Sequence, residues 1–147
     1  MRRRTLRGQF EEGTNKRLVL NDGRLNHGYK VVRFVIACEP TASGYDAYAT
    51  LSLDEASAKK WDWGDNRQIG WASTNAPATG SLDAPFSVLD PDHVVIQDLF
   101  IQGQVQSAGG TDLINYLIEL EPVTLSDDQA IITLIKERSQ DDRRKTN

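Results

Sequence analysis

Several short segments of this chain alternate residue by residue between apolar and more polar side chains. In YDAYATLSL, residues 45–53, the odd positions are mostly apolar and the even positions mostly polar. LINYLIELEPVTL, residues 113–125, alternates in a similar way. Successive side chains of a β-strand point to opposite faces, so this period predicts strands with two unlike faces.

Other segments are rich in β-branched and aromatic residues, which favour strands. They are residues 29–40, 67–74 and 93–106, with shorter candidates at 17–20 and 85–93. Turn formers such as Asn21-Asp22-Gly23 separate them. No regular exchange of strands with helices is visible. We therefore expect an all-β fold, an antiparallel β-sandwich of jelly-roll-like topology.

Residues 126–140 fit two structures. Ser126 followed by Gln129 is typical of a capping box at a helix start, and Asp127 and Asp128 suit a helix N-terminus. The three isoleucines of AIITLIKE, with a threonine and period-2 alternation, instead indicate a strand. We favour the strand, which would return from residues 113–125 as a long hairpin.

Charge is distributed unevenly over the 147 residues. Residues 1–17 carry six positive and two negative side chains, so their net charge is +4 and the remaining 130 residues sum to −8. We expect an extended basic N-terminal arm over residues 1–17, one sandwich domain over 18–141, and a charged tail over 142–147. The arm supplies four contact candidates: Arg2, Arg3, Arg4 and Arg7.

All three tryptophans lie in WDWGDNRQIGW, residues 61–71. Trp61, Trp63, Asp62 and Asp65 are candidates for a contact site. One hypothesis places the rings in the core or in a subunit interface, where aromatic anchors are enriched. The alternative is carbohydrate or host-surface binding, with rings stacked on a sugar and carboxylates accepting its hydroxyls.

Recognisable catalytic and metal-binding motifs are missing from the sequence. Asp90-Pro91-Asp92-His93 has metal-ligating residue types, but a turn is the simpler interpretation. Asp62 with Asp65 lacks the spacing of a calcium loop, and Glu119 with Glu121 suits a solvated strand face. Cys38 is expected to be a buried thiol. We expect no catalytic activity, no metal and no cofactor.

The chain start, MRRRTLRGQF, has no apolar segment typical of a signal peptide, and no run of apolar residues is long enough to cross a membrane. We expect no membrane partner.

Three features together resemble a known group of proteins: the arm RRRTLRG, the turn-rich β-body, and the succession DNRQIGWAS, VLDPDHVVIQDLFIQG and NYLIELEPVTLSDDQAIITLIKERSQD. The chain resembles small structural proteins of marine bacteriophages over residues 18–141. This resemblance implies a capsid or capsid-associated subunit on a β-sandwich, located in the virion after assembly in the host cytoplasm. Its expected partners are copies of itself, other virion proteins and, through the arm, nucleic acid.

Overall fold

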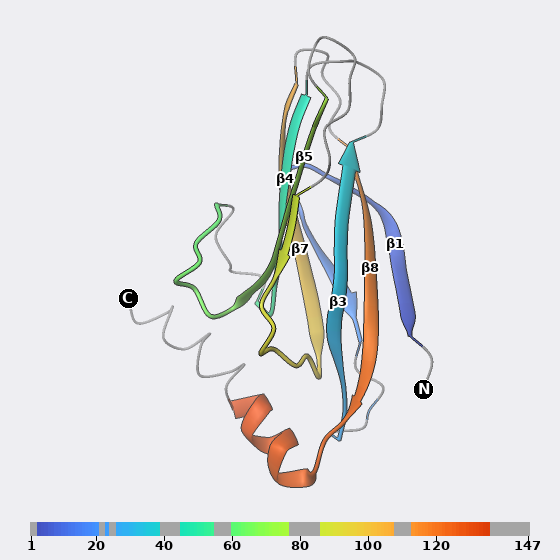
Figure 1. Ribbon diagram of the computed structural model, residues 1–147, viewed down its shortest axis with the longest axis vertical. Coiled ribbons are helices and arrows are strands. Elements are labelled where there is room, and N and C mark those ends of the chain that lie inside the picture. Colours follow the sequence, from blue (N-terminus) through green and yellow to red (C-terminus); the bar gives the residue numbers. More distant parts are fainter. Residues whose placement is uncertain are drawn as a thin grey trace.

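The computed structural model describes residues 3–20, 23, 26–38, 45–54, 60–76, 86–107 and 113–135. These residues form eight strands in two antiparallel sheets (Figure 1). The strands are β1 (Arg4–Glu11), β2 (Asn15–Val19), β3 (His27–Cys38), β4 (Tyr45–Ser52), β5 (Gln68–Ala76), β6 (Phe86–Leu89), β7 (Asp98–Ser107) and β8 (Leu113–Thr124). One sheet has the order β1-β8-β3 and the other β2-β7-β4-β5-β6. The predicted all-β architecture with antiparallel strands is confirmed.

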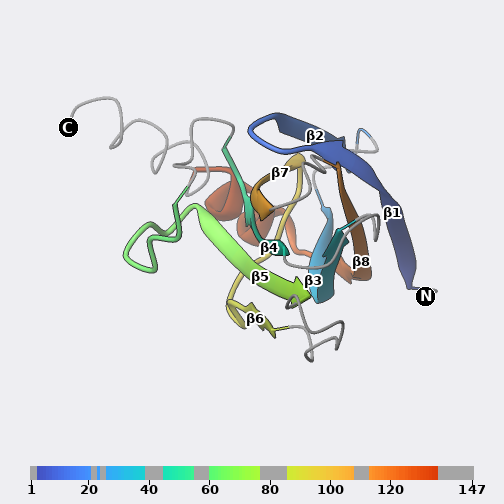
Figure 2. The ribbon, with the colours of Figure 1, turned by 90° about the horizontal axis from the view of Figure 1, so that it is seen from above.

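The two sheets face each other across one hydrophobic core (Figure 2). In β8, Ile114 and Ile118 are fully buried, whereas Leu117 between them is half-buried on the opposite face. Phe34 of β3 and Ile101 of β7 belong to the same core. Burying a side chain of this size contributes about 1.5–3 kcal/mol. The alternation in the sequence therefore decides which face of each sheet is internal.

Residues 4–17, predicted as part of an extended basic arm, instead form β1, a turn and most of β2. β1 pairs with β8 from Arg4 opposite Leu120 to Glu11 opposite Leu113, and β2 pairs with β7. The physical reason is the inward face of β1, where Phe10 is only 4% exposed. The basic segment thus supplies an edge strand to each sheet instead of a separate arm.

The β1–β2 turn joins the two sheets. Gly13 adopts a φ of 76°, which glycine tolerates without steric cost. Its N–H donates to the carbonyl oxygen of Gly103 in β7 at 2.8 Å, and the carboxylate of Glu12 accepts the N–H of Val105 at 2.8 Å. The turn is therefore anchored on the five-stranded sheet, and β2 continues along the edge of that sheet.

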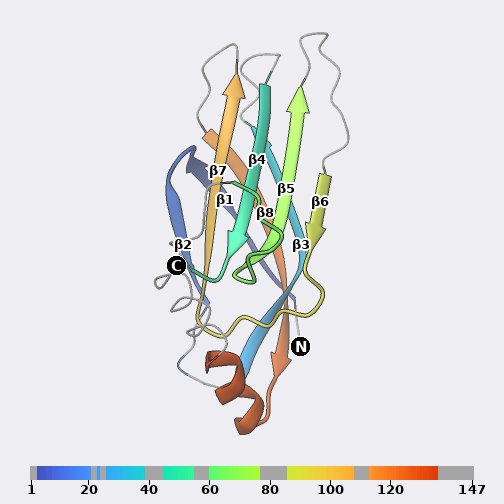
Figure 3. The same ribbon diagram turned by 90° about the vertical axis from the view of Figure 1, so that its left-hand side faces the viewer.

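The favoured hairpin over residues 126–140 is wrong in its described part, because residues 127–135 form a helix at one end of the molecule (Figure 3). The Ser126 N–H donates to Gln129 Oε1 at 3.1 Å, and the Gln129 N–H donates to Ser126 Oγ at 3.2 Å. This capping box satisfies two N–H groups that a helix start leaves unpaired. In the part of the chain that the structure describes, no helix is long and apolar enough to cross a membrane.

Some expectations fall on residues outside the described ranges. They are the contact candidate Arg2, residues 136–140 of the C-terminal element, and the charged tail over 142–147. The side chain of Cys38 also lies outside the described part.

Candidate functional site

The segment that contains Trp61 and Trp63 lies over the outer face of the five-stranded sheet. Trp61 stacks on Phe86 of β6, with ring centroids 5.7 Å apart, and meets Tyr48 of β4 edge-on at 6.2 Å. Its Nε1 donates to the carbonyl oxygen of Ala49 at 3.2 Å. Trp61 is therefore packed on the sheet, and its polar atom has a backbone partner.

Trp63 projects from this surface and is 66% exposed. Its ring meets Trp71 of β5 at 5.9 Å and thereby covers it, so that Trp71 is buried. Trp71 lies opposite Val88 of β6, and both Val88 and Phe86 are exposed. We call this surface the tryptophan face; it comprises Tyr48, Trp61, Trp63, Trp71, Phe86 and Val88. A contiguous exposed apolar surface of this kind is typical of an interaction site.

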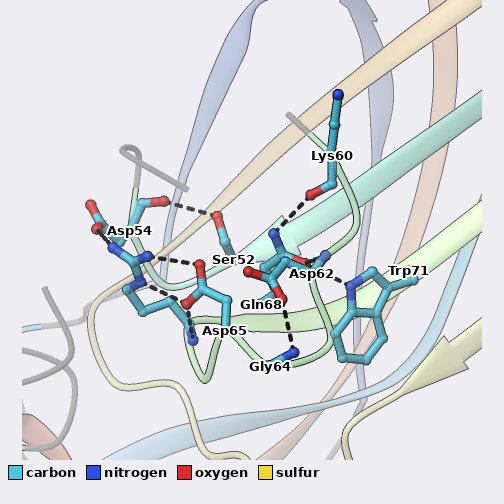
Figure 4. A network of polar contacts seen from close by, with 9 residues as sticks. Ser52, Asp54, Lys60, Asp62, Gly64, Asp65, Gln68 and Trp71 are labelled. Carbon is cyan, nitrogen blue, oxygen red and sulfur yellow. Dashed lines mark hydrogen bonds and ion pairs between the residues drawn. The ribbon is translucent and has the colours of Figure 1, made fainter. Parts of the chain in front are cut away.

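A buried amide orients the turn that presents Trp63 (Figure 4). Gln68 Oε1 accepts both the Trp71 Nε1–H and the Asp62 N–H, each at 2.9 Å. Gln68 Nε2 donates to the carbonyl oxygen of Lys60 at 3.1 Å. One side chain that is 2% exposed thus fixes residues 60 and 62 relative to the sheet. The turn that carries Trp63 is therefore pre-organised.

Arg67 fixes the other end of the same turn. Its guanidinium forms ion pairs with Asp65 at 2.7 Å and with Asp54 at 3.0 Å, and its side chain is 7% exposed. Burial disfavours the charged form, but the hydrogen bonds and charges of Asp65 and Asp54 outweigh it, so the pKa of Arg67 is raised. The cation is therefore permanent and holds both carboxylates.

The two aspartates predicted as contact candidates have intramolecular partners. Asp65 binds Arg67, and Asp62 Oδ1 accepts the N–H of Gly64 at 3.0 Å while its side chain remains at the surface. Asp65 is therefore part of a structural turn. Trp61 and Trp63 pack on different partners, and this arrangement does not favour the paired platform that sugar stacking needs.

Arg67 and Gln68 were not among the residues singled out in the sequence. One signal for Arg67 was present: it is the only Lys or Arg between Lys60 and Lys136, in an acidic part of the chain. A lone cation in such a stretch is a candidate for a buried ion pair. Gln68 gave no comparable signal.

The arginine candidates of the N-terminal segment lie elsewhere, on the three-stranded sheet. Arg3 is exposed just before β1, and the Arg4 guanidinium lies 5.9 Å from the ring centre of Tyr29. Arg7 points outward from β1 and has no ion-pair partner among the described residues. The structure therefore does not bring the arginine and tryptophan candidates together.

Arg7 borders a shallow depression of about 600 Å³ on the outer face of the three-stranded sheet. Leu117 and Val35 lie in register with Arg7 across the sheet and form an apolar floor. Arg33 forms part of the rim, and its ion pair with Glu119 is loose, with 3.6 Å between the guanidinium nitrogen and the carboxylate oxygen. We call this surface the arginine depression.

Asp90-Pro91-Asp92-His93 forms the predicted turn. The Asp92 N–H donates to Asp90 Oδ1 at 3.0 Å, and His93 Nδ1 donates to the Asp90 carbonyl oxygen. His93 Nε2 accepts the N–H of Val31 at 2.9 Å, beside a bulge in β3. The imidazole is therefore a buried connector between this turn and β3. Burial lowers its pKa.

Among the described residues, no group of three or more His, Cys, Asp or Glu side chains is arranged to hold a metal ion. Glu119 lies half-buried on the outer face of β8 beside Arg33, and Glu121 is exposed.

Comparison of the chain with protein-family models, with curated proteins and with solved structures gave no match.

Proposed function

We propose that this chain is a structural subunit of a virion, a capsid or capsid-associated protein that assembles with copies of itself and with other virion proteins. The proposal assigns it a binding role, with no catalytic activity and no cofactor. The observation that carries it is the tryptophan face, an exposed aromatic surface on a rigid support.

The fold supports this proposal. A jelly roll is a long antiparallel ribbon in which the first strand pairs with the eighth, the second with the seventh, the third with the sixth and the fourth with the fifth. The pairs β1–β8, β2–β7 and β4–β5 follow this scheme. β6 pairs with β5 instead of β3, yet Ser87 of β6 donates its hydroxyl to the carbonyl oxygen of Phe34 in β3. We therefore propose a jelly roll whose sixth strand has moved to the opposite sheet.

Jelly rolls serve in viral capsids, in lectins and in cupins, so topology alone does not select a function. The surface favours the first of these. The turn that carries Trp63 is held by the buried side chains of Gln68 and Arg67, and the Trp63 ring contacts Trp71 while remaining 66% exposed. Rigid, exposed aromatic anchors at low entropic cost are typical of protein–protein hot spots.

In the proposed subunit the basic N-terminal segment contributes to assembly as an edge strand of the sheet and not as a free arm. Arg3, Arg4 and Arg7 lie on or beside the edge strand β1, where they are open to a neighbouring subunit. The same arginines are the proposed contact with nucleic acid, as phosphate neutralisation needs no sequence readout.

The test is the mass of the purified chain by light scattering from micromolar to millimolar concentration, with electron microscopy of the largest species. We expect closed symmetric assemblies with a defined subunit number. A monomer of constant mass up to the highest concentration would contradict the proposal.

Carbohydrate binding is the second candidate, because Trp63 is exposed beside the surface carboxylate of Asp62. Titration of the tryptophan fluorescence with a glycan panel separates the two functions. A saturable change that disappears in Trp63→Ser, in a chain that stays monomeric, would select this candidate.

A further inference from the structure

The tryptophan face and the arginine depression lie on opposite outer faces of the molecule. The segment with Trp63 covers the five-stranded sheet, and the depression lies on the three-stranded sheet. Figure 2 shows these two sheets as separate layers of the molecule. The two surfaces cannot meet within one chain. Any contact between them joins two molecules.

Their chemistry is complementary. The projecting residues are Asp62 and Trp63, one anionic and one aromatic, side by side in a turn. The depression has an apolar floor with Leu117 and Val35, and its rim carries Arg7 and Arg33. An indole on that floor would lose water-exposed area, and the neighbouring carboxylate would meet a guanidinium.

The charges of the two regions also differ in sign. Among the described residues of 45–107, two cations, Lys60 and Arg67, stand against seven aspartates. Lys16 and Arg17 of β2 belong to the same five-stranded sheet, and the charge of this side stays negative with them. The strands of the three-stranded sheet, together with Arg3 just before β1, carry five cations and three glutamates. Opposite charge on opposite faces of one molecule favours the approach of a second copy in a head-to-tail orientation.

We infer that the turn with Asp62 and Trp63 of one copy docks into the arginine depression of the next copy. The occupant of the depression is therefore a second molecule of this chain. This inference rests on the proposed function, because it names the surfaces through which the subunit assembles. The contact is heterologous, so repetition leads to a ring if the rotation closes and to a filament if it does not.

The experiment uses the full chain and two single variants. Trp63→Ser removes the projection, and Arg7→Glu reverses the charge at the depression. Light scattering and analytical ultracentrifugation give the mass of each, and circular dichroism confirms that each is folded. We expect either change to raise the dissociation constant by at least about thirtyfold, as for an interface hot spot.

Mixing the two variants provides the decisive measurement. Arg7→Glu retains an intact projection, and Trp63→Ser retains an intact depression. One molecule of each variant can therefore form one complete contact, whereas the reverse contact is lost on both sides. We expect an equimolar mixture to form a heterodimer and no larger species, although each variant alone is monomeric. If each variant is monomeric and the mixture stays monomeric too, the contact is not heterologous and the inference falls.

Two control variants lie outside both surfaces. Glu121→Lys reverses an exposed charge on the three-stranded sheet, opposite Lys30 and outside the depression, and Val19→Ser removes an exposed apolar side chain at the far edge of the five-stranded sheet. We expect both to assemble like the unmodified chain. If Trp63→Ser is not folded, Trp63→Lys replaces it, because a lysine would face the arginines with like charge.

The outcomes separate the inference from the proposed function. If the unmodified chain assembles and both single variants keep its mass, copies associate through other surfaces, and only the inference is overturned. If the unmodified chain stays monomeric at every concentration, both are overturned.

Discussion

Arg67 neutralises two carboxylates that are largely withdrawn from water. Asp54 and Asp65 have side chains that are 13% and 11% exposed, and both bind the guanidinium. Removal of one partner from a buried ion pair costs about 3–5 kcal/mol, because a charge remains without compensation. We expect Arg67→Leu to lower the free energy of unfolding by about this amount in urea denaturation.

A matched control tests whether the cause is charge. In Arg67→Leu combined with Asp54→Asn and Asp65→Asn, no uncompensated charge remains at these positions, so most of the lost stability should return. If the triple variant is as unstable as the single one, the ion pairs are not the reason.

His93 makes stability depend on pH. Its Nε2 accepts the N–H of Val31, and burial lowers its pKa in the folded chain. In the unfolded chain the imidazole of His93 is protonated below a pH of about 6.5, whereas in the folded chain it is protonated only at a lower pH. The contribution of neutral His93 to the free energy of unfolding is therefore fully present above that pH. It falls as the pH drops below about 6.5 and goes on falling until the pKa of the folded state is reached.

We expect His93→Gln to flatten the pH dependence of the unfolding free energy between about pH 7 and pH 5, with lower stability at neutral pH. Urea denaturation at several pH values measures this. His27→Gln is the control, since His27 is the other histidine of the chain. An unchanged slope in His93→Gln would show that other groups cause the dependence.

At the scale of the elements, the strands with one buried face were predicted closely from the sequence. Residues 45–53 correspond to β4 (Tyr45–Ser52), and residues 113–125 to β8 (Leu113–Thr124). Burial on one face selects apolar residues at every second position, and this leaves a readable period. The tryptophan turn was predicted as a candidate because its aromatic and acidic residues cluster in the sequence, whereas the contacts of Gln68 and Arg67 depend on tertiary packing.

β1 and the helix were missed for physical reasons that differ. One inward position of β1 is Gly8, where a Cβ would lie only 2.9 Å from the hydroxyl of Tyr116. This glycine interrupts the alternation of apolar and polar residues that would have indicated a strand. In the helix, the capping box of Ser126 and Gln129 prevails over the β-propensity of the isoleucines. Two local signals opposed each other there, and tertiary packing of Ala130 adds to the helix.

The identity of β1 as a structural strand is testable by truncation. Deletion of residues 1–11 removes Phe10 from the core and uncovers the edge of β8. We expect a loss of at least about 3–5 kcal/mol, the cost of removing a buried phenylalanine, and hence unfolding or aggregation. Deletion of residues 1–3 is the control and should leave thermal unfolding unchanged. An arm would tolerate both deletions.

The helix offers a contrast between its two faces. Ala130 is 1% exposed, whereas Ile132 is 55% exposed. We expect Ala130→Glu to destabilise the protein or to detach the helix, because it forces a larger, charged side chain into a buried position. Ile132→Glu should change the free energy of unfolding by no more than about 0.5 kcal/mol. Urea denaturation compares the two, and equal effects would contradict this packing.

At the scale of the whole molecule, the two ends of the described chain pair with each other. β1 binds β8 and β2 binds β7, so neither sheet is complete until residues from both ends have met. The entropy of closing these long loops must be overcome before the contacts are formed. Among the described residues, contacts between segments close in the sequence are found in the helix and in pairs such as β4 with β5.

This topology predicts slow folding. Proteins dominated by non-local strand pairs refold in about a millisecond to seconds, whereas helical bundles need microseconds to milliseconds. Stopped-flow dilution from urea, followed by tryptophan fluorescence, measures the rate. The signal reports on the five-stranded sheet, because Trp61 and Trp71 pack there. Circular dichroism should follow the same time course if the sheets form together. A fluorescence amplitude lost within the mixing time would show instead that the β4–β5 part of the five-stranded sheet forms before the chain ends meet.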